Sequence, residues 1–231
     1  MRELMEIIMQ HSKLSVVGLL IVAQFFTGPI HAEDDANTLK ENTWIVRTGY
    51  TNINPQSNNG DIANVGDQSN FTTTFVYFLN NNIGIEVLAG FPFRHNIYDK
   101  ALGTGLKIGS ASHLPPTVTL QYYFDSSSKL QPYFGLGLNH TLFFKEKASG
   151  PLSGADIRLG SSTDLSLQVG FDYELSNNRF LNLDIRKIQI NSKATVTNIG
   201  NTALHDVLPD ELVFDVPIDP LVIGINLAWK F

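Results

Sequence analysis

The final segment of the chain, residues 221–231, alternates residue by residue between large apolar and smaller, more polar side chains. The large apolar positions are Leu221, Ile223, Ile225, Leu227, Trp229 and Phe231. Successive side chains of an extended strand point to opposite faces, so this period of two predicts a β-strand with one apolar face. A soluble sandwich strand can also alternate, but such strands usually run only roughly 3–10 residues.

Seven earlier segments alternate in the same way. They are residues 44–54, 70–79, 83–94, 117–124, 131–144, 164–175 and 179–193. In the last of these the phase slips, because Ile188 and Ile190 fall on the face that carries the polar residues, and the sequence leaves their orientation open. Together with the final segment they make eight strands, an even number, as the barrels of bacterial outer membranes require.

The connections between these segments alternate between short and long. The short ones, rich in Asn, Asp and Ser as turns are, cover residues 80–82, 125–129 and 176–178. The long ones cover about 55–69, 95–116, 145–163 and 194–217. Short turns at one end and long extracellular loops at the other are typical of outer-membrane barrels. We therefore predict an all-β fold, an eight-stranded antiparallel transmembrane β-barrel.

The N-terminus has the pattern of an export signal. An apolar run over residues 14–26 is followed by small and polar residues and by His31 and Ala32, just before acidic Glu33. A membrane-spanning helix needs about 20 apolar residues, so the run is too short to span. We predict a cleaved signal peptide over residues 1–32 and a single mature domain over 33–231. An uncleaved anchor or a buried helix is the alternative.

Composition excludes several other classes of protein. Charged residues make up only 16% of the chain, against about 25% in soluble domains. The net charge of -6 argues against a nucleic-acid partner, and the absence of Cys excludes disulfides and thiolate metal sites. We expect no cofactor and no bound metal.

His140, which the alternation places on the outward face, is the candidate for a catalytic role. Some eight-stranded barrels act on lipid A with outward His and Ser side chains, but no Ser lies two residues from His140. The arrangement needed for nucleophilic catalysis is therefore missing. We predict that the protein is not an enzyme and has no catalytic residue.

Several stretches, in this order along the chain, resemble the OmpW/AlkL family of eight-stranded outer-membrane β-barrel proteins. They are residues 82–86, 92–95, 113–124, 132–144, 169–173, 181–186 and 218–220. The resemblance covers essentially the whole mature chain. It implies a barrel in the outer membrane of a Gram-negative bacterium, linked to passage of small hydrophobic molecules. Where the family pattern often has a Trp before the sixth strand, this chain has Thr163, so a pore-shaping role for that aromatic is not carried over.

The predicted interior carries charge towards the periplasmic end. Its charged positions are Arg47, Glu86, Asp172, Glu174, Asp184, Arg186 and Lys230. The interior of an eight-stranded barrel is just wide enough for side chains or one small ligand, and buried charges persist when they are paired. We interpret these residues as a salt-bridge plug. A set of catalytic carboxylates is the competing interpretation.

Above this plug the inward positions become apolar. We expect Val76, Leu88, Ile188 and Ile190 to line an upper cavity. A guest stopped by the plug must leave sideways, and proline cannot donate to a β-ladder. We therefore predict a lateral opening at Pro92, Pro115 and Pro116. A second candidate lies between the eighth and first strands, near Pro55, Pro217 and Pro220. The simpler interpretation is that these prolines only end strands.

These features favour passive passage of small hydrophobic molecules through an apolar upper cavity. The alternative is a non-transporting structural or adhesive barrel whose loops bind surfaces or partners. The expected partners are outer-membrane lipid, lipopolysaccharide contacted by Lys145, Lys147 and Arg158, small hydrophobic molecules, and the barrel-assembly machinery through the C-terminal Phe231.

Overall fold

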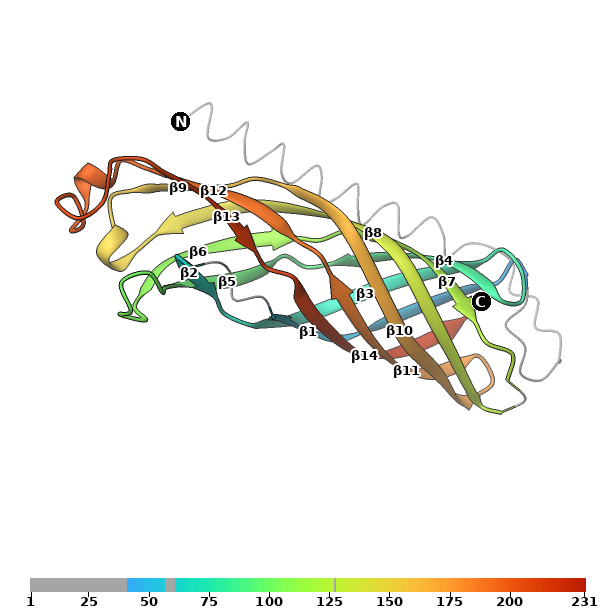
Figure 1. Ribbon diagram of the computed structural model, residues 1–231. Helices are drawn as coiled ribbons and strands as arrows, with labels where there is room; N and C mark the ends of the chain where they lie inside the picture. The colour runs from blue at the N-terminus through green and yellow to red at the C-terminus, as the bar shows by residue number, and fades with distance from the viewer. Residues whose placement is uncertain (1–40, 57–60, 127) are drawn as a thin grey trace, which may run out of the picture. The chain divides into compact units, whose positions relative to one another are not determined.

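The computed structural model describes residues 41–56, 61–126 and 128–231 (Figure 1). The predicted signal peptide and its cleavage site after Ala32 lie outside these residues. No helix in the described part of the chain is long and apolar enough to cross a membrane.

Eight long strands form the barrel, as predicted. They are β1 (Trp44–Pro55), β3 (Gln68–Phe78), β4 (Ile83–Gly90), β7 (Thr117–Tyr123), β8 (Leu130–Ala148), β10 (Ser162–Ser176), β11 (Arg179–Ile188) and β14 (Pro220–Lys230). Each strand pairs antiparallel with its neighbours, and β14 pairs with β1 over a register that runs from Ile45↔Lys230 to Pro55↔Pro220. This last ladder closes the sheet on itself. The prediction of an eight-stranded antiparallel barrel is confirmed.

The long connections contain more regular structure than the loops we expected. In their described residues lie β2 (Ala63–Val65), β5 (Phe93–Asp99), β6 (Lys107–Leu114), β9 (Asp156–Leu159), β12 (Asn191–Thr197) and β13 (Leu212–Pro217), with short 3-10 helices η1 (Gly150–Leu152) and η2 (Ile199–Asn201). They extend the barrel wall as two sheets, one in the order β2-β5-β6-β8 and one in the order β13-β12-β9 (Figure 1). The barrel end with the short turns is periplasmic, as in outer-membrane barrels, so these sheets lie on the extracellular side.

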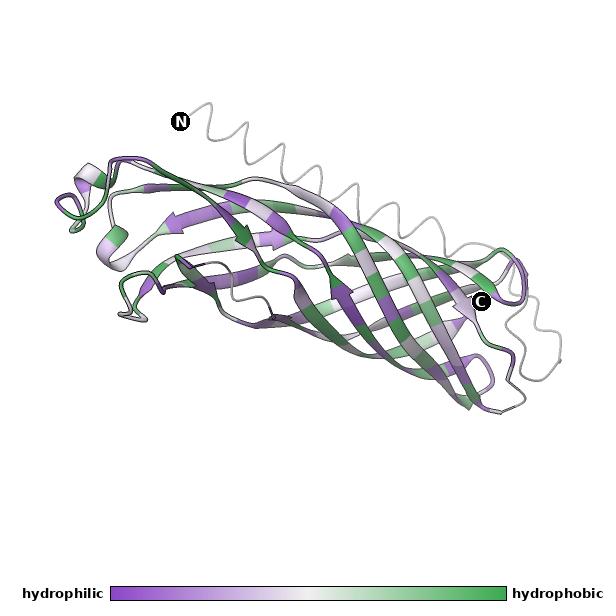
Figure 2. Ribbon diagram, in the orientation of Figure 1, coloured by the Kyte–Doolittle hydropathy of each residue, from purple (hydrophilic) through white to green (hydrophobic). Residues whose placement is uncertain are grey.

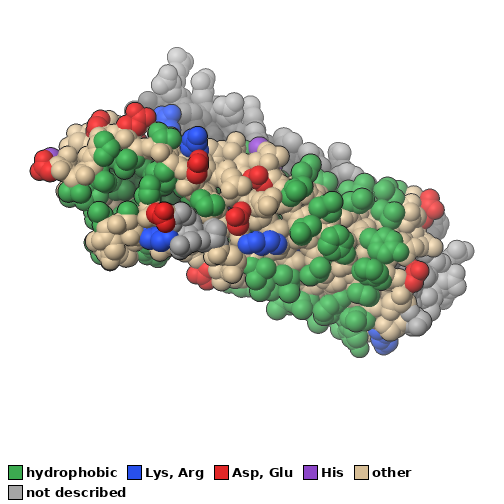
Figure 3. All heavy atoms as spheres, in the orientation of Figure 1, with side chains coloured by type: hydrophobic (Ala, Val, Ile, Leu, Met, Phe, Trp, Pro, Cys, Tyr) green, Lys and Arg blue, Asp and Glu red, His purple; other side chains and the backbone are tan. Residues whose placement is uncertain are grey.

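The outside of the barrel is apolar. Large apolar side chains that are exposed there include Phe71, Val87, Val118, Leu120, Phe134, Leu136, Leu138, Leu165, Leu167, Val169, Ile223, Ile225 and Leu227. Along the barrel strands hydrophobic and hydrophilic residues alternate (Figure 2), and the visible face of the barrel carries a dense band of hydrophobic side chains (Figure 3). A wall with this outer face requires an apolar solvent, which is lipid.

The inward face changes its chemistry along β11 without changing its phase. Burial alternates without interruption from Phe180 to Ile188, and Ile190 beyond the strand end is also buried. Asn182, Asp184 and Arg186 take the inward positions between them. The apparent phase slip in the sequence is therefore a change from a polar to an apolar interior on one continuous face.

The outward row of β14 generates a test of membrane insertion. Ile225 is 58% exposed and lies at the middle of the strand. We expect Ile225→Arg to lower the free energy of unfolding by about 2–4 kcal/mol, because a charge there faces the bilayer midplane. Val207→Arg is the control, since Val207 is 63% exposed but lies in the extracellular connection. Unfolding in urea from phospholipid vesicles measures both, and equal effects would contradict a lipid-facing wall.

Candidate functional site

A charged layer crosses the barrel interior, and Arg47 lies at its centre. The Arg47 guanidinium donates from Nη1 to Glu86 Oε2 at 2.8 Å, and from Nε and Nη2 to the two carboxylate oxygens of Asp172 at 3.0 and 2.7 Å. Arg47, Glu86 and Asp172 are all 0% exposed. Such a bidentate arginine–carboxylate pair is among the stronger hydrogen-bonded contacts in proteins.

A second arginine extends the layer. Arg186 Nε donates to Asp184 Oδ1 at 2.9 Å, and its Nη1 lies 2.8 Å from Glu86 Oε1. Glu86 therefore joins the two guanidinium groups. The layer then holds two arginines and three carboxylates, and each carboxylate can accept about four hydrogen bonds, more than the guanidinium groups supply. Amide and phenol donors serve the rest: Gln121 donates to Glu86 at 3.0 Å, Asn182 to Asp172 at 2.9 Å, Asn226 to Asp184 at 3.4 Å and Tyr123 to Asp172 at 3.4 Å.

The sequence anticipated part of this layer. The structure brings Arg47, Glu86, Asp172, Asp184 and Arg186 together as described above. Glu174 and Lys230 are half-buried near the periplasmic strand ends instead. The amide and tyrosine members were missed. The signal for one of them was present, because Tyr123 follows outward Tyr122 and so had to point inward.

An apolar cluster closes the barrel on the periplasmic side of the charged layer. Its buried residues are Ile45, Val76, Phe78, Tyr123, Tyr133, Phe180 and Ala228. The rings of Tyr123 and Tyr133 lie 5.0 Å apart, and the Arg47 guanidinium lies 5.0 Å from the centre of the Tyr133 ring. Val76, expected to line the upper cavity, packs here instead. The interior therefore has a closed floor of ion pairs resting on aromatic and aliphatic side chains.

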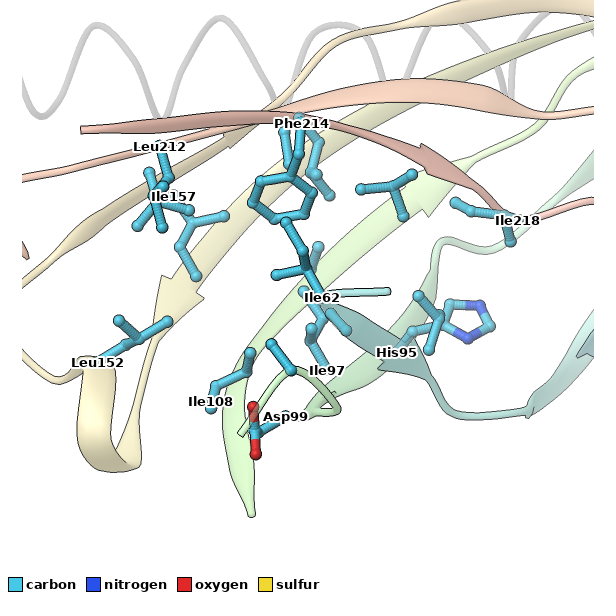
Figure 4. Close-up of a pocket in the computed structure, with 18 of the residues that line it drawn as sticks. Ile62, His95, Ile97, Asp99, Ile108, Leu152, Ile157, Leu212, Phe214 and Ile218 are labelled. Atoms are coloured by element: carbon cyan, nitrogen blue, oxygen red, sulfur yellow. The ribbon is translucent and has the colours of Figure 1, made fainter. Parts of the chain in front are cut away.

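The cavity lies at the extracellular end, within the wall built by the two additional sheets. It has a volume of about 310 Å³. Its lining is almost wholly apolar, and the residues labelled in Figure 4 converge on it from β5, β6, β9 and β13 and from the connections between strands. Of the expected lining residues, Ile190 is present. Ile188 is buried in an apolar cluster with Ile190, Phe93 and Val222, and Leu88 is buried in β4 without reaching the cavity.

Two stacked histidines are the main polar feature of this lining. The rings of His95 and His113 are nearly parallel, and their centres lie 4.9 Å apart. The Phe93 ring also stacks on the His113 ring, with 5.6 Å between the ring centres. His95 Nδ1 lies 2.6 Å from the Gly66 carbonyl oxygen. Burial lowers the pKa of His95, and burial next to His95 lowers the pKa of His113 to about 3. Both rings are therefore neutral at physiological pH.

The other polar side chains of the lining, Asp99 and Thr104, are hydrogen-bonded to each other within one turn. Asp99 accepts hydrogen bonds from the Thr104 hydroxyl at 2.6 Å and from the backbone N–H groups of Leu102 and Thr104. The Thr104 hydroxyl is the main reason that the pKa of Asp99 is lowered. This carboxylate therefore shapes the turn between β5 and β6. Within the described ranges, no three His, Cys, Asp or Glu side chains are grouped so that they could hold a metal ion.

A first interruption of the barrel wall lies between two successive ladders. The ladder of β4 and β7 ends at Leu88↔Thr117, and the ladder of β5 and β6 begins at Phe93↔His113. The break between them contains Pro92, Pro115 and Pro116. None of these prolines lines the cavity.

The second interruption lies between β2 and β13, which end their two sheets without a ladder joining them in the part of the chain described. The cavity lining includes Val65 of β2 and Val216 of β13, together with Pro220 at the start of β14. We refer to this boundary between β2 and β13 as the seam. The cavity thus reaches both edges of the seam.

Comparisons with known proteins agree with this architecture. The model of the OmpW family matches residues 32–231. Outer membrane protein W of Vibrio cholerae serotype O1 is 34% identical over 231 residues, covering 95% of this chain and 100% of that protein. Outer membrane protein AlkL of Ectopseudomonas oleovorans is 25% identical, over 96% of this chain and 100% of its own length. The crystal structure of the outer membrane protein OprG from Pseudomonas aeruginosa superimposes with a TM-score of 0.76 at 30% identity, covering 85% of this chain and 99% of OprG.

The charged layer generates a stability test. Arg47→Met removes one member of a fully buried network, and we expect it to lower the free energy of unfolding by about 3–5 kcal/mol, because Asp172 stays buried without its arginine and Glu86 keeps only Arg186. Lys193→Met is the control, since the Lys193–Asp215 pair spans 4.0 Å with side chains 66% and 84% exposed and should contribute less than about 1 kcal/mol. Urea titration of the refolded proteins decides, and an Arg47→Met variant as stable as the wild type would overturn the assignment.

Proposed function

This chain belongs to the OmpW family and lies in the outer membrane of a Gram-negative bacterium, and from that premise we propose that it gives small hydrophobic molecules passive, non-catalytic passage. The observation that supports this function is the apolar cavity of about 310 Å³ at the extracellular end. Ligand pockets usually measure roughly 300–1,000 Å³ and are mostly apolar. A pocket of this size and lining suits a small apolar guest.

The cavity volume limits the size of that guest. At roughly 30 Å³ for each water-sized group, the space holds on the order of ten heavy atoms. A short alkane or a bicyclic aromatic molecule is of this size. Burial of apolar surface is the driving force for its uptake, at roughly 25 cal/mol for each Å² removed from water. No charged group of the lining needs to be desolvated, since Asp99 is already hydrogen-bonded within its own turn.

The closed floor determines the exit. Arg47, Arg186 and their carboxylate partners fill the barrel below the cavity, so passage straight through would break buried ion pairs. We propose that the guest leaves sideways through the seam, because cavity-lining residues reach both of its edges. The break at Pro92, Pro115 and Pro116 is the alternative lateral opening.

One observation favours the competing role of a surface-binding barrel. Leu102, Leu106 and Val207 are exposed apolar side chains on extracellular connections. Exposed apolar patches can mark contacts with other surfaces. The basic side chains of Lys145, Lys147 and Arg158 are exposed on the same side, where the phosphates of lipopolysaccharide are the proposed partner.

Filling the cavity tests the transport function. Ala111 lines the cavity and is 5% exposed. We expect Ala111→Phe to lower naphthalene uptake by whole cells roughly fivefold, because the added ring occupies much of a pocket near the lower size limit for ligands. Ala203→Phe is the matched control, since Ala203 is exposed in the connection between β12 and β13, outside the cavity. Both variants are compared with the wild type in cells that lack other copies of the protein. Equal uptake by all three would favour the surface-binding role.

Photolabelling tests the exit. A diazirine-bearing naphthalene, photolysed during uptake, should label residues at the seam, such as Val65, Val216 and Pro220, because a guest passing there touches both edges. Peptide mapping by mass spectrometry locates the label. Label concentrated on residues 89–92 and 114–116 would instead place the opening at the proline break.

A further inference from the structure

His95 occupies a distinctive place in the cavity. In Figure 4 it lies at the end near Ile218, across the cavity from Leu152. It is 5% exposed, and its neighbours in the lining are mostly aliphatic. A histidine in such a setting needs partners for both ring nitrogens, because an unpaired buried polar atom costs about 1–3 kcal/mol.

The hydrogen bond to Gly66 fixes the chemistry of the ring. A carbonyl oxygen only accepts hydrogen bonds, so His95 Nδ1 must carry the proton that it donates to the Gly66 oxygen at 2.6 Å. The ring is neutral, since burial lowers the pKa of His95. His95 Nε2 is therefore an unprotonated acceptor. It is buried and has no hydrogen-bond partner among the residues that the structure describes.

His113 keeps this acceptor in place. Its ring is stacked on the rings of both His95 and Phe93, and it also contacts the Phe143 ring at 5.9 Å. The Nε2 atom of His113 is likewise buried without a partner in the described ranges of the chain. Two neutral imidazoles thus lie side by side in the lining, each with one ring nitrogen left unpaired within those ranges.

We propose that His95 and His113 form a polar recognition site within the cavity, which favours apolar guests that carry one hydrogen-bond donor. The class is that of phenols and aliphatic alcohols, whose hydroxyl donates to His95 Nε2 while the hydrocarbon part contacts the apolar lining. The proposal requires a small rotation of the His95 ring about its Cβ–Cγ bond, because the Nε2 atom is buried. This inference rests on the proposed function, since it names the preferred guest of the same cavity.

The donor, rather than polarity in general, is what the site selects. A ketone or an ether offers only acceptors, and the neutral His95 Nε2 has no proton to give them. A charged guest would lose its hydration with little in return, because Asp99, the carboxylate of the described lining, already accepts hydrogen bonds from Leu102 and Thr104. A single hydroxyl on an apolar body satisfies the unpaired nitrogen without either cost.

Whole-cell uptake of three guests of similar size tests this inference on the wild-type protein. They are naphthalene, 1-naphthol and 1-methoxynaphthalene, of which only 1-naphthol carries a donor. We expect 1-naphthol to be preferred over 1-methoxynaphthalene by roughly fivefold, since one net hydrogen bond contributes about 1 kcal/mol and 1.4 kcal/mol is a factor of ten. Each rate is corrected by that of cells lacking the protein.

Substitution locates the preference. His95→Phe keeps an aromatic ring but removes the acceptor. The corrected uptake rates of 1-naphthol and 1-methoxynaphthalene should then be about equal. His140→Phe is the control, because His140 is an exposed histidine whose Nδ1 contacts Thr163 Oγ1 at 2.6 Å outside the cavity. If His95→Phe does not fold, the ¹⁵N resonance of His95 Nε2 in wild-type protein in lipid bilayers replaces it. That resonance should shift on addition of 1-naphthol and stay in place with 1-methoxynaphthalene.

The outcomes separate the two proposals. Naphthalene uptake no faster than in cells without the protein would overturn the transport function itself. Naphthalene uptake with no preference for 1-naphthol over 1-methoxynaphthalene would overturn only the recognition site. A preference retained in His95→Phe would equally overturn the role of His95.

Discussion

The ladder between β1 and β14 is the contact on which the rest of the structure depends. Lipid offers no partner for a free backbone N–H or C=O group, so a sheet can stand in a membrane only when its edges meet. Pairing from Ile45↔Lys230 to Pro55↔Pro220 achieves this. Closure with eight strands also fixes an interior about as wide as its side chains. Which side chains point inward at each level then decides where the interior is closed and where it is hollow.

The barrel itself was predictable because each strand must alternate, residue by residue, between side chains that face lipid and side chains that face the interior. Lipid outside and protein inside force a period of two, and Ile223, Ile225 and Leu227 show it directly. The depth of a residue was harder to predict. Val76 was assigned to the upper cavity but packs under the charged layer, because strand tilt and stagger set the level at which residues of different strands meet. Alternation within one strand carries no information on that offset.

The cavity could not be predicted from the sequence, because the segments that form its walls do not alternate clearly between apolar and polar residues. Its walls come largely from β2, β5, β6, β9, β12 and β13, which fall in segments that looked like loops. Their apolar positions face inward but are interrupted by turns, bulges and short helices, such as the register shift between Ile97 and Tyr98. The charged layer shows the same limit in another form. Its arginines and carboxylates could be recognised in the sequence as inward charges. The roles of Gln121 and Asn182 as donors to Glu86 and Asp172 become clear only once the structure places these side chains next to each other.

The proposed passage of a guest depends on the division between a closed barrel and two open sheets. The membrane part cannot open without exposing backbone groups to lipid, and its interior is held by ion pairs of Arg47 and Arg186. The two extracellular sheets lie beyond that closed ladder, and no ladder joins β2 and β13 in the part of the chain described. In the proposed function, a guest in the cavity would therefore leave where no ladder has to break, above a floor of buried ion pairs. Under that proposal, a cavity outside the closed ladder keeps the exchange of hydrophobic guests separate from the permeability barrier below.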